Sequence, residues 1–115
     1  FWATWCGPCI RALPIIREVT ADMAEQDVVL YTVNQRESDD KVNAFLQKKE
    51  WTDMNVLMDR EAAVAKAYMV RGIPQTVIIG KDGTVQAVHV GFSPQIGDTL
   101  RKELQTLAKG GSLVE

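Results

Sequence analysis

Cysteine and histidine are scarce in this chain: its 115 residues include only two cysteines and one histidine. Two cysteines cannot build a disulfide-rich scaffold, nor a zinc site with four cysteine ligands. Charge of one sign is not in excess either, because 13 Lys and Arg stand against 15 Asp and Glu and leave a net charge of −2. The chain therefore lacks the basic surplus that would neutralise a nucleic-acid backbone, and we expect no nucleic-acid partner.

Long apolar runs and nucleotide-binding motifs are absent as well. No stretch approaches the roughly 20 apolar residues that a membrane-spanning helix requires. No G-x-G-x-x-G sequence occurs, so the chain has no motif for a flavin or nicotinamide cofactor. The remaining composition, with 46% hydrophobic and 24% charged residues, is that of an ordinary globular protein of one domain.

The order of apolar and turn-forming segments predicts an α/β domain with a mixed sheet and helices on both of its faces. We expect this domain to span residues 1–109 and a flexible tail to span 110–115. The predicted elements are, in order, the end of a strand at 1–3, a helix at 6–25 interrupted by Pro14, a strand at 28–33 covered on both faces, a helix capped by Ser38 that ends near Lys49, a strand at 55–58, a helix capped by Asp59 that ends near Tyr68, strands at 76–79 and 84–90, and a helix capped by Ser93 that ends before Gly110.

The sequence Trp5-Cys6-Gly7-Pro8-Cys9 lies where the first predicted strand gives way to a helix. Cys6 would then lie at the helix N-terminus, where unpaired N–H groups and the helix dipole stabilise a thiolate and lower its pKa from about 8.5 toward or below 7. Cys9, nearly one turn further on, is within disulfide reach and deeper. Cys6 is therefore the predicted nucleophile and Cys9 the resolving thiol. Gly7 leaves the approach to Cys6 open, and Pro8 suits the first helical turn.

Two other interpretations of the cysteines are a structural disulfide and half of a metal site. A disulfide that closes so short a loop removes little entropy from the unfolded chain. A zinc site would need two further ligands, and only His89 remains besides carboxylates. We therefore favour the redox interpretation and expect no metal. Trp5 is expected to shape the exposed rim of the site, and Trp2 to lie in the core.

Gly72-Ile73-Pro74 precedes the predicted strand at 76–79 and is the second candidate site element. If the Ile73–Pro74 peptide bond is cis, the turn would place Pro74 beside the two sulfurs. The backbone N–H and C=O of Ile73 would then face outward and could pair with an extended segment of a substrate.

Three stretches of the chain together resemble the thioredoxin superfamily: Phe1-Trp2-Ala3-Thr4-Trp5-Cys6-Gly7-Pro8-Cys9, Arg71-Gly72-Ile73-Pro74 and Lys81-Asp82-Gly83. They look most like the TlpA-like extracytoplasmic thiol-disulfide oxidoreductases of bacteria, which include proteins of cytochrome c maturation. The resemblance implies a thioredoxin-like fold over residues 1–109, one or more strands upstream of Phe1, and a cis Pro74 at a substrate groove with Gly91 near its floor.

The chain departs from the family at three points. Ala12 stands where TlpA-like proteins often carry a Glu, and the buried Asp that precedes the Phe in thioredoxins would lie outside this chain. The proton acceptor for Cys9 is therefore unassigned, and Glu18 lies on a different face of the helix. Gly7-Pro8 is the pair found in reducing thioredoxins, which favours a reductant over an oxidant.

The resemblance implies a monomeric reductase of protein disulfides outside the cytoplasm, with a role in redox homeostasis and antioxidant activity. The redox-active Cys6–Cys9 disulfide would serve in place of a cofactor, and a membrane-embedded thiol carrier would supply electrons. A cytoplasmic thioredoxin reduced by a flavoprotein, and a peptide-binding module with a redox switch, are the alternatives. A peroxidase is disfavoured because Ala3 occupies the position where peroxiredoxin-type sites use Thr.

Overall fold

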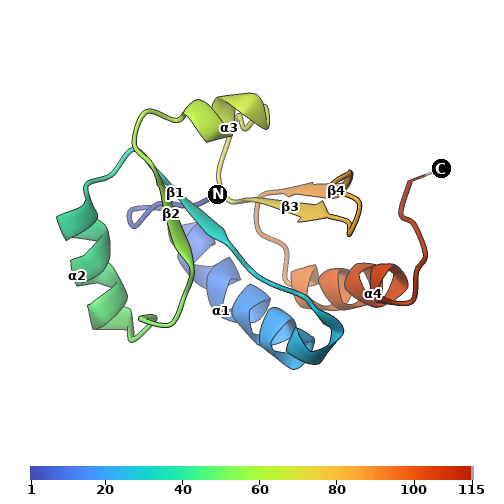
Figure 1. The fold of residues 1–115 in the computed structure, drawn as a ribbon. Coiled ribbons are helices and arrows are strands. Elements are labelled where there is room, and N and C mark those ends of the chain that lie inside the picture. Colours follow the sequence, from blue (N-terminus) through green and yellow to red (C-terminus); the bar gives the residue numbers. More distant parts are fainter. Residues whose placement is uncertain (115) are drawn as a thin grey trace.

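Four α-helices and four β-strands follow one another along residues 1–114, which are the residues described by this computed structural model (Figure 1). The elements are α1 (Gly7–Asp22), a short 3-10 helix η1 (Ala24–Gln26), β1 (Thr32–Gln35), α2 (Asp39–Lys49), β2 (Val56–Asp59), α3 (Ala63–Ala67), β3 (Gln75–Ile79), β4 (Val85–Val90) and α4 (Ile96–Ala108). The predicted α/β order is confirmed. None of the helices in this described part is long and apolar enough to cross a lipid bilayer.

The strands form two small sheets, one of parallel β1 and β2 and one of antiparallel β3 and β4. The segment Phe1–Ala3 runs between them. The Trp2 N–H donates to the Val33 carbonyl at 3.0 Å, and the Gln35 N–H donates to the Trp2 carbonyl at 2.9 Å. On the other side, the Phe1 amino group donates to the Gln75 carbonyl at 2.8 Å. Within residues 1–114 the predicted mixed sheet is therefore split into two strand pairs, and β1 and β3 are linked only through the hydrogen bonds of Phe1–Ala3.

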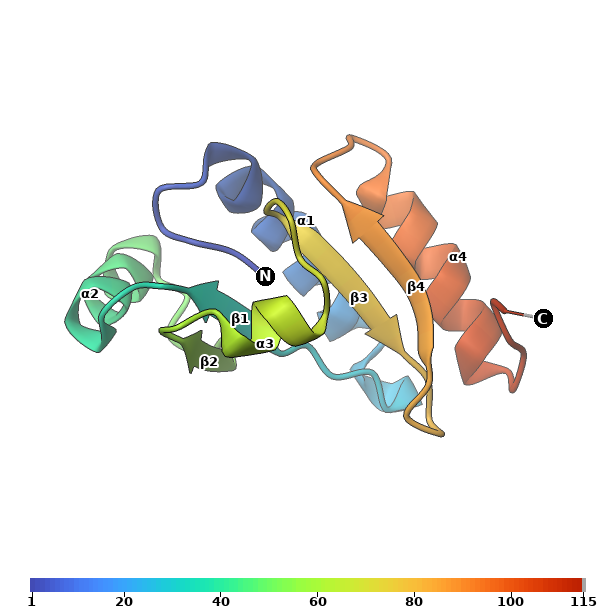
Figure 2. The ribbon, with the colours of Figure 1, turned by 90° about the horizontal axis from the view of Figure 1, so that it is seen from above.

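Helices lie on both sides of the strands, as expected (Figures 1 and 2). α1 and α4 run together on one side, α3 lies on the opposite side, and α2 stands at the β2 end of the molecule. Ser38 caps α2 as predicted, because its hydroxyl accepts the Lys41 N–H at 3.3 Å. The turn between β3 and β4 includes Gly83 with φ of +85°, a conformation that glycine adopts without strain.

The core has two parts that meet along α1. The first includes the cysteines and packs α1 against α2, and its buried members are Trp2, Ala3, Cys6, Cys9, Leu13, Val42, Leu46 and Trp51. The second packs α1 against α4 and β3, and its buried members are Ala12, Ile16, Val19, Met23, Ile78, Ile96 and Leu100. The predicted core position of Trp2 is confirmed, with 1% of its surface exposed. α1 is thus held on two faces, which fixes the helix end that carries the cysteines.

The predicted strand at 28–33 is displaced in the structure. β1 begins only at Thr32, and Val29 and Tyr31 are 63% and 62% exposed, so the expectation that this run is covered on both faces is wrong for these residues. An extended apolar segment becomes a strand only where a neighbouring backbone pairs with it. β2 offers partners from Val56 onward, and β1 therefore begins opposite that residue.

Two helices begin later than predicted. α3 starts at Ala63, and Asp59 instead ends β2, with its carboxylate accepting the N–H groups of Val64 and Ala65 at 3.1 and 2.9 Å. α4 starts at Ile96 with Gln95 as its N-cap residue, so Ser93 is not the N-cap. Ser93 organises the preceding turn, because its carbonyl accepts the N–H of Ile96.

Candidate active site

Cys6 and Cys9 form a disulfide at the N-terminus of α1, with their Cα atoms 5.3 Å apart. Cys6 is the N-cap residue, and its Sγ accepts the backbone N–H of Cys9 at 3.2 Å. Pro8 lies in the first turn, where helical N–H groups have no partner within the helix, so its missing donor costs nothing. A negative charge on Cys6 Sγ would meet the Cys9 N–H and the positive end of the helix dipole, an arrangement that can stabilise a thiolate.

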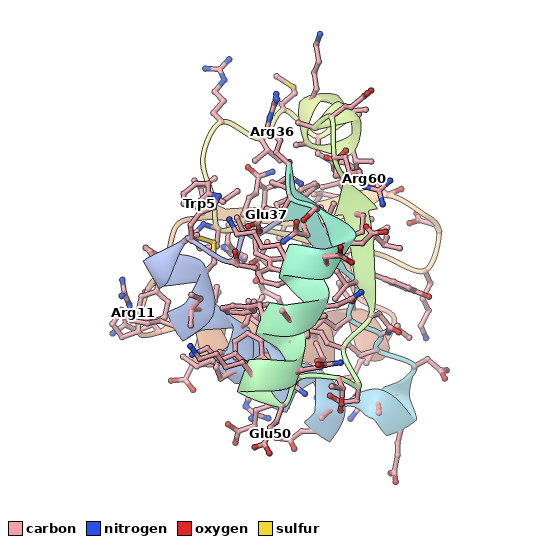
Figure 3. All side chains as sticks on the ribbon, turned by 90° about the vertical axis from the view of Figure 1, so that its left-hand side faces the viewer. Trp5, Arg11, Arg36, Glu37, Glu50 and Arg60 are labelled. Carbon is pink, nitrogen blue, oxygen red and sulfur yellow. A yellow bond between two sulfur atoms is a disulfide. The ribbon has the colours of Figure 1, made fainter. Side chains whose placement is uncertain are left out.

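The two sulfurs differ in their surroundings. Cys9 is fully buried, whereas 4% of the Cys6 residue is exposed. The residues on either side of Cys6 are exposed to solvent: Trp5 is 69% exposed, and Gly7 and Pro8 are exposed too. Figure 3 shows the disulfide close to Trp5 at one end of α1. An incoming group therefore meets Cys6 before Cys9, in the order that the predicted nucleophilic and resolving roles require.

The Pro74 turn faces this disulfide. The Ile73–Pro74 peptide bond is cis, as expected, and the Ile73 carbonyl oxygen lies 3.8 Å from Cys6 Sγ. Gly91 joins the same corner, because its N–H donates to the Pro74 carbonyl at 2.8 Å. Its φ of +82° lies in the region that favours glycine. Among residues 1–114, the Ile73 N–H has no hydrogen-bond partner. The roles of Ile73, Pro74 and Gly91 in substrate binding stay predictions.

An apolar groove of about 420 Å³ lies behind the disulfide, between β1 and β3. Its walls include Cys9, Ala12 and Gln75, and no carboxylate belongs to the walls that residues 1–114 form. Glu18 is exposed on the surface of α1. The described part of the chain thus offers Cys9 no acidic neighbour in this groove, and its proton acceptor stays unassigned.

Two charged residues that sequence analysis did not single out lie near the site. The Arg11 guanidinium lies 5.6 Å from the centre of the Phe92 ring and next to Gly7. The carboxylate of Glu37 accepts two hydrogen bonds from Thr4, which precedes Trp5. Arg11 lies on the exposed face of α1, so in the sequence it looks like any charged residue on a helix surface. Glu37 follows a strand, and no local pattern signals a contact with a residue 33 positions earlier.

A metal site at the cysteines finds no support in the contacts of His89. Its Nε2 lies 2.6 Å from Glu103 Oε1, between β4 and α4. In the portion of the chain described, no group of three or more His, Cys, Asp or Glu residues is arranged to hold a metal ion.

A CXXC disulfide at a helix N-terminus, facing a cis proline on an α/β fold, defines a thioredoxin-like protein. The sequence profile of the AhpC/TSA family matches residues 1–88, and the chain belongs to this family. The resemblance to thioredoxin-like proteins is confirmed on this match and on the relatives that follow.

Three similar proteins cover most of the chain. It is 34% identical over 91 residues to the thiol-disulfide oxidoreductase ResA of Geobacillus kaustophilus, a match that covers 79% of this chain and 52% of ResA. It is 31% identical over 109 residues to thioredoxin of Mycoplasmoides gallisepticum, covering 95% of this chain and 77% of that protein. A crystal structure assigned as thiol:disulfide interchange protein DsbE from Chlorobium tepidum has a TM-score of 0.86 and 27% identity, over 94% of this chain and 76% of that one. The chain spans about half the length of the ResA relatives it matches.

Proposed function

We propose that this protein is a thiol-disulfide oxidoreductase that reduces disulfides of other proteins through Cys6 and Cys9. The observation that carries this proposal is the geometry of Cys6: its Sγ accepts the Cys9 N–H at the start of α1 and lies 3.8 Å from the Ile73 carbonyl oxygen, beside cis Pro74. The names of similar proteins, which include thiol-disulfide oxidoreductase, support the same chemistry.

Reduction would proceed by two exchanges. The Cys6 thiolate attacks one sulfur of the substrate disulfide, so that a bond from Cys6 to that sulfur forms and the substrate S–S bond breaks. The departing substrate sulfur leaves as a thiolate and takes a proton. Cys9 then loses its proton and attacks Cys6 Sγ, which forms the Cys6–Cys9 disulfide and releases the second substrate thiol. Two electrons pass from the protein to the substrate; of the two protons that the substrate thiolates take up, Cys9 supplies one, and the solvent, which received the Cys6 proton when that thiol ionised, supplies the other.

The substrate would lie across the face formed by the Pro74 turn and the cysteines. The unpaired N–H of Ile73 can donate to an extended substrate backbone, and Trp5 supplies an exposed apolar surface beside Cys6. Gly7, Pro8 and Gly91 would line the edge of this face, because all three are exposed. This arrangement suits backbone recognition, which accepts many protein substrates.

The source of electrons and the compartment are further parts of the proposal. The oxidised protein must be returned to the dithiol by another dithiol, and we propose a membrane-embedded thiol carrier as donor and a site of action outside the cytoplasm. The resemblance to the TlpA-like group supports both of these proposals. It also supports the proposals that the protein is a monomer and that it serves cytochrome c maturation. The Gly7-Pro8 pair favours electron flow toward the substrate.

Reduction of insulin disulfides by dithiothreitol, followed by turbidity, tests the activity. We expect the wild-type protein to accelerate it, and Cys6→Ser to abolish the acceleration. Cys9→Ser should instead accumulate mixed disulfides through Cys6 that appear on non-reducing gels, which would isolate the natural substrates. Undiminished acceleration by Cys6→Ser would disprove the proposal.

A further inference from the structure

The backbone that leads into Cys6 is held by a side chain where its strand pairing ends. Trp2 makes two hydrogen bonds of a parallel ladder with β1, through Val33 and Gln35. The next donor on the same edge of this segment is the Thr4 N–H, which does not continue the ladder to a β1 carbonyl. Glu37 takes the place of the missing strand carbonyl, because its Oε1 accepts the Thr4 N–H at 2.7 Å.

The Glu37 carboxylate is saturated with donors. It also accepts the Thr4 hydroxyl at 2.5 Å and the Asn34 side-chain amide at 2.9 Å, and the Lys41 ammonium lies 3.5 Å away. Only 3% of its side chain is exposed. Burial by itself would raise the pKa of Glu37, but the hydrogen bonds from Thr4, Asn34 and Lys41 together lower it. The group is therefore a buried carboxylate in its charged form at neutral pH.

The contact between Glu37 and Thr4 is linked to Cys6 through the backbone of Thr4 and Trp5. The Cys6 N–H donates to the Ala3 carbonyl at 3.2 Å and closes a turn that contains Thr4 and Trp5. Fixing Thr4 at both its N–H and its hydroxyl fixes this turn, and with it the N-cap position of Cys6. Figure 3 shows Glu37 next to the start of α2, on the side of the molecule where Trp5 and the disulfide lie.

We infer that Glu37 is a positioning residue for the nucleophile: by clamping Thr4 it holds Cys6 Sγ against the N-terminal amides of α1. The inference rests on the function proposed above, and it assigns Glu37 no contact with the substrate. Loosening the clamp should weaken the Cys9 N–H contact with the Cys6 thiolate. A direct effect of the Glu37 charge would act in the opposite direction, because a nearby negative charge disfavours a thiolate.

Four variants of the reduced protein separate these effects. Glu37→Gln removes the charge and turns an amide toward the Thr4 donors. Thr4→Val keeps the carboxylate and the Thr4 N–H but deletes the hydroxyl bond, and Thr4→Ser restores that hydroxyl. Glu18→Gln removes an exposed carboxylate from α1 and is the matched control. The rate of alkylation of Cys6 by iodoacetamide is measured from about pH 5 to 9, the range in which a thiol held as a thiolate titrates, with the modified cysteine identified by mass spectrometry and thermal unfolding recorded for each variant.

We expect the alkylation rate at pH 7 to fall about threefold in Thr4→Val and up to about tenfold in Glu37→Gln, as for loss of a hydrogen bond to a charged group felt partly at the sulfur. The apparent pKa of Cys6 should rise in both, while Thr4→Ser and Glu18→Gln match the wild type. If Glu37→Gln does not fold, the Thr4 pair decides alone, because both variants retain the carboxylate.

Two results would overturn the inference. In the first, thermal stability falls but the pH profile of alkylation does not move, which would make Glu37 a structural residue only. In the second, Glu37→Gln speeds alkylation at neutral pH, which would show that its charge and not its clamp acts on Cys6. A wild-type Cys6 that titrates like an ordinary cysteine would instead refute the proposed function, and the two failures are therefore distinguishable.

Discussion

Asp59 holds the helix that precedes the Pro74 turn, and its replacement by asparagine gives a sharp test of how this part of the fold is stabilised. The residue is 5% exposed at the end of β2. Its carboxylate accepts the backbone N–H groups of Val64 and Ala65 and the side-chain amide of Gln35 at 3.2 Å. α3 is too short to be stable without such contacts, since isolated helices of a few residues do not persist in water.

The expected loss follows from the number of charged hydrogen bonds. A hydrogen bond to a charged group contributes about 1.5–3 kcal/mol and a neutral one about 1 kcal/mol. The asparagine side chain would retain one acceptor oxygen but turn its NH₂ group toward a donor. Asp59→Asn should therefore lower the free energy of unfolding by about 2–3 kcal/mol. We expect a lower urea midpoint at neutral pH with an unchanged slope, followed by circular dichroism.

Asp53→Asn is the matched control, because it removes the same charge from an ion pair at the surface. Asp53 bonds Arg17, but its side chain is 81% exposed. Exposed pairs contribute little, so this variant should lose less than about 1 kcal/mol. Equal losses in the two variants would refute the argument that burial and backbone donors give Asp59 its weight.

The pH dependence adds a second check on Asp59. Burial alone would raise its pKa, but the backbone hydrogen bonds of Ala65 and Val64 and the Gln35 amide lower it overall. A carboxyl whose pKa is lowered on folding contributes stability above its unfolded pKa, and that contribution is lost as the pH falls through the folded value. The difference between wild type and Asp59→Asn should thus be constant from about pH 5 to 7 and shrink below about pH 4. A difference that stays constant down to about pH 2 would contradict this sign.

Two further predictions concern the core and the rim. Leu100, which is 2% exposed where α4 meets α1, should lose about 2–5 kcal/mol on Leu100→Ala, measured by urea unfolding with the exposed Leu57→Ala as control. Trp5→Ala should change thermal stability little, because the side chain is 69% exposed, yet slow the reduction of insulin several-fold; an unaltered rate would remove Trp5 from the substrate surface.

The parts of the site that sequence analysis predicted are those that depend on local chemistry. Cys6 lies at a helix N-terminus because Pro8 starts the helix and the strand residues before it end there, and both signals lie within a few residues. Ser38 caps α2 for the same reason. The cis bond at Pro74 is different. The Gly-Ile-Pro sequence is compatible with either isomer, so the expectation of a cis bond came from the family resemblance.

The parts that sequence analysis missed depend on distant partners. Val28 to Tyr31 have the composition of a strand, but the pairing that defines β1 begins opposite Val56. Asp59 caps the third helix as predicted, but an intervening turn, in which Ala62 has a φ of +58°, delays the start of α3 to Ala63, and this delay was missed. Glu37 contacts Thr4 across 33 residues. In each case the residue type was visible, but its partner was set by tertiary packing.

The division of the strands into two pairs bears on how the cysteines and the Pro74 turn are held next to each other. Cys6 follows a segment bonded to β1, whereas Pro74 precedes β3, so the cysteines and the Pro74 turn are attached to different strand pairs. Phe1–Ala3 bonds to both pairs, and α1 packs in both parts of the core, so the distance from Cys6 to the Pro74 turn is set by this segment and by α1 together.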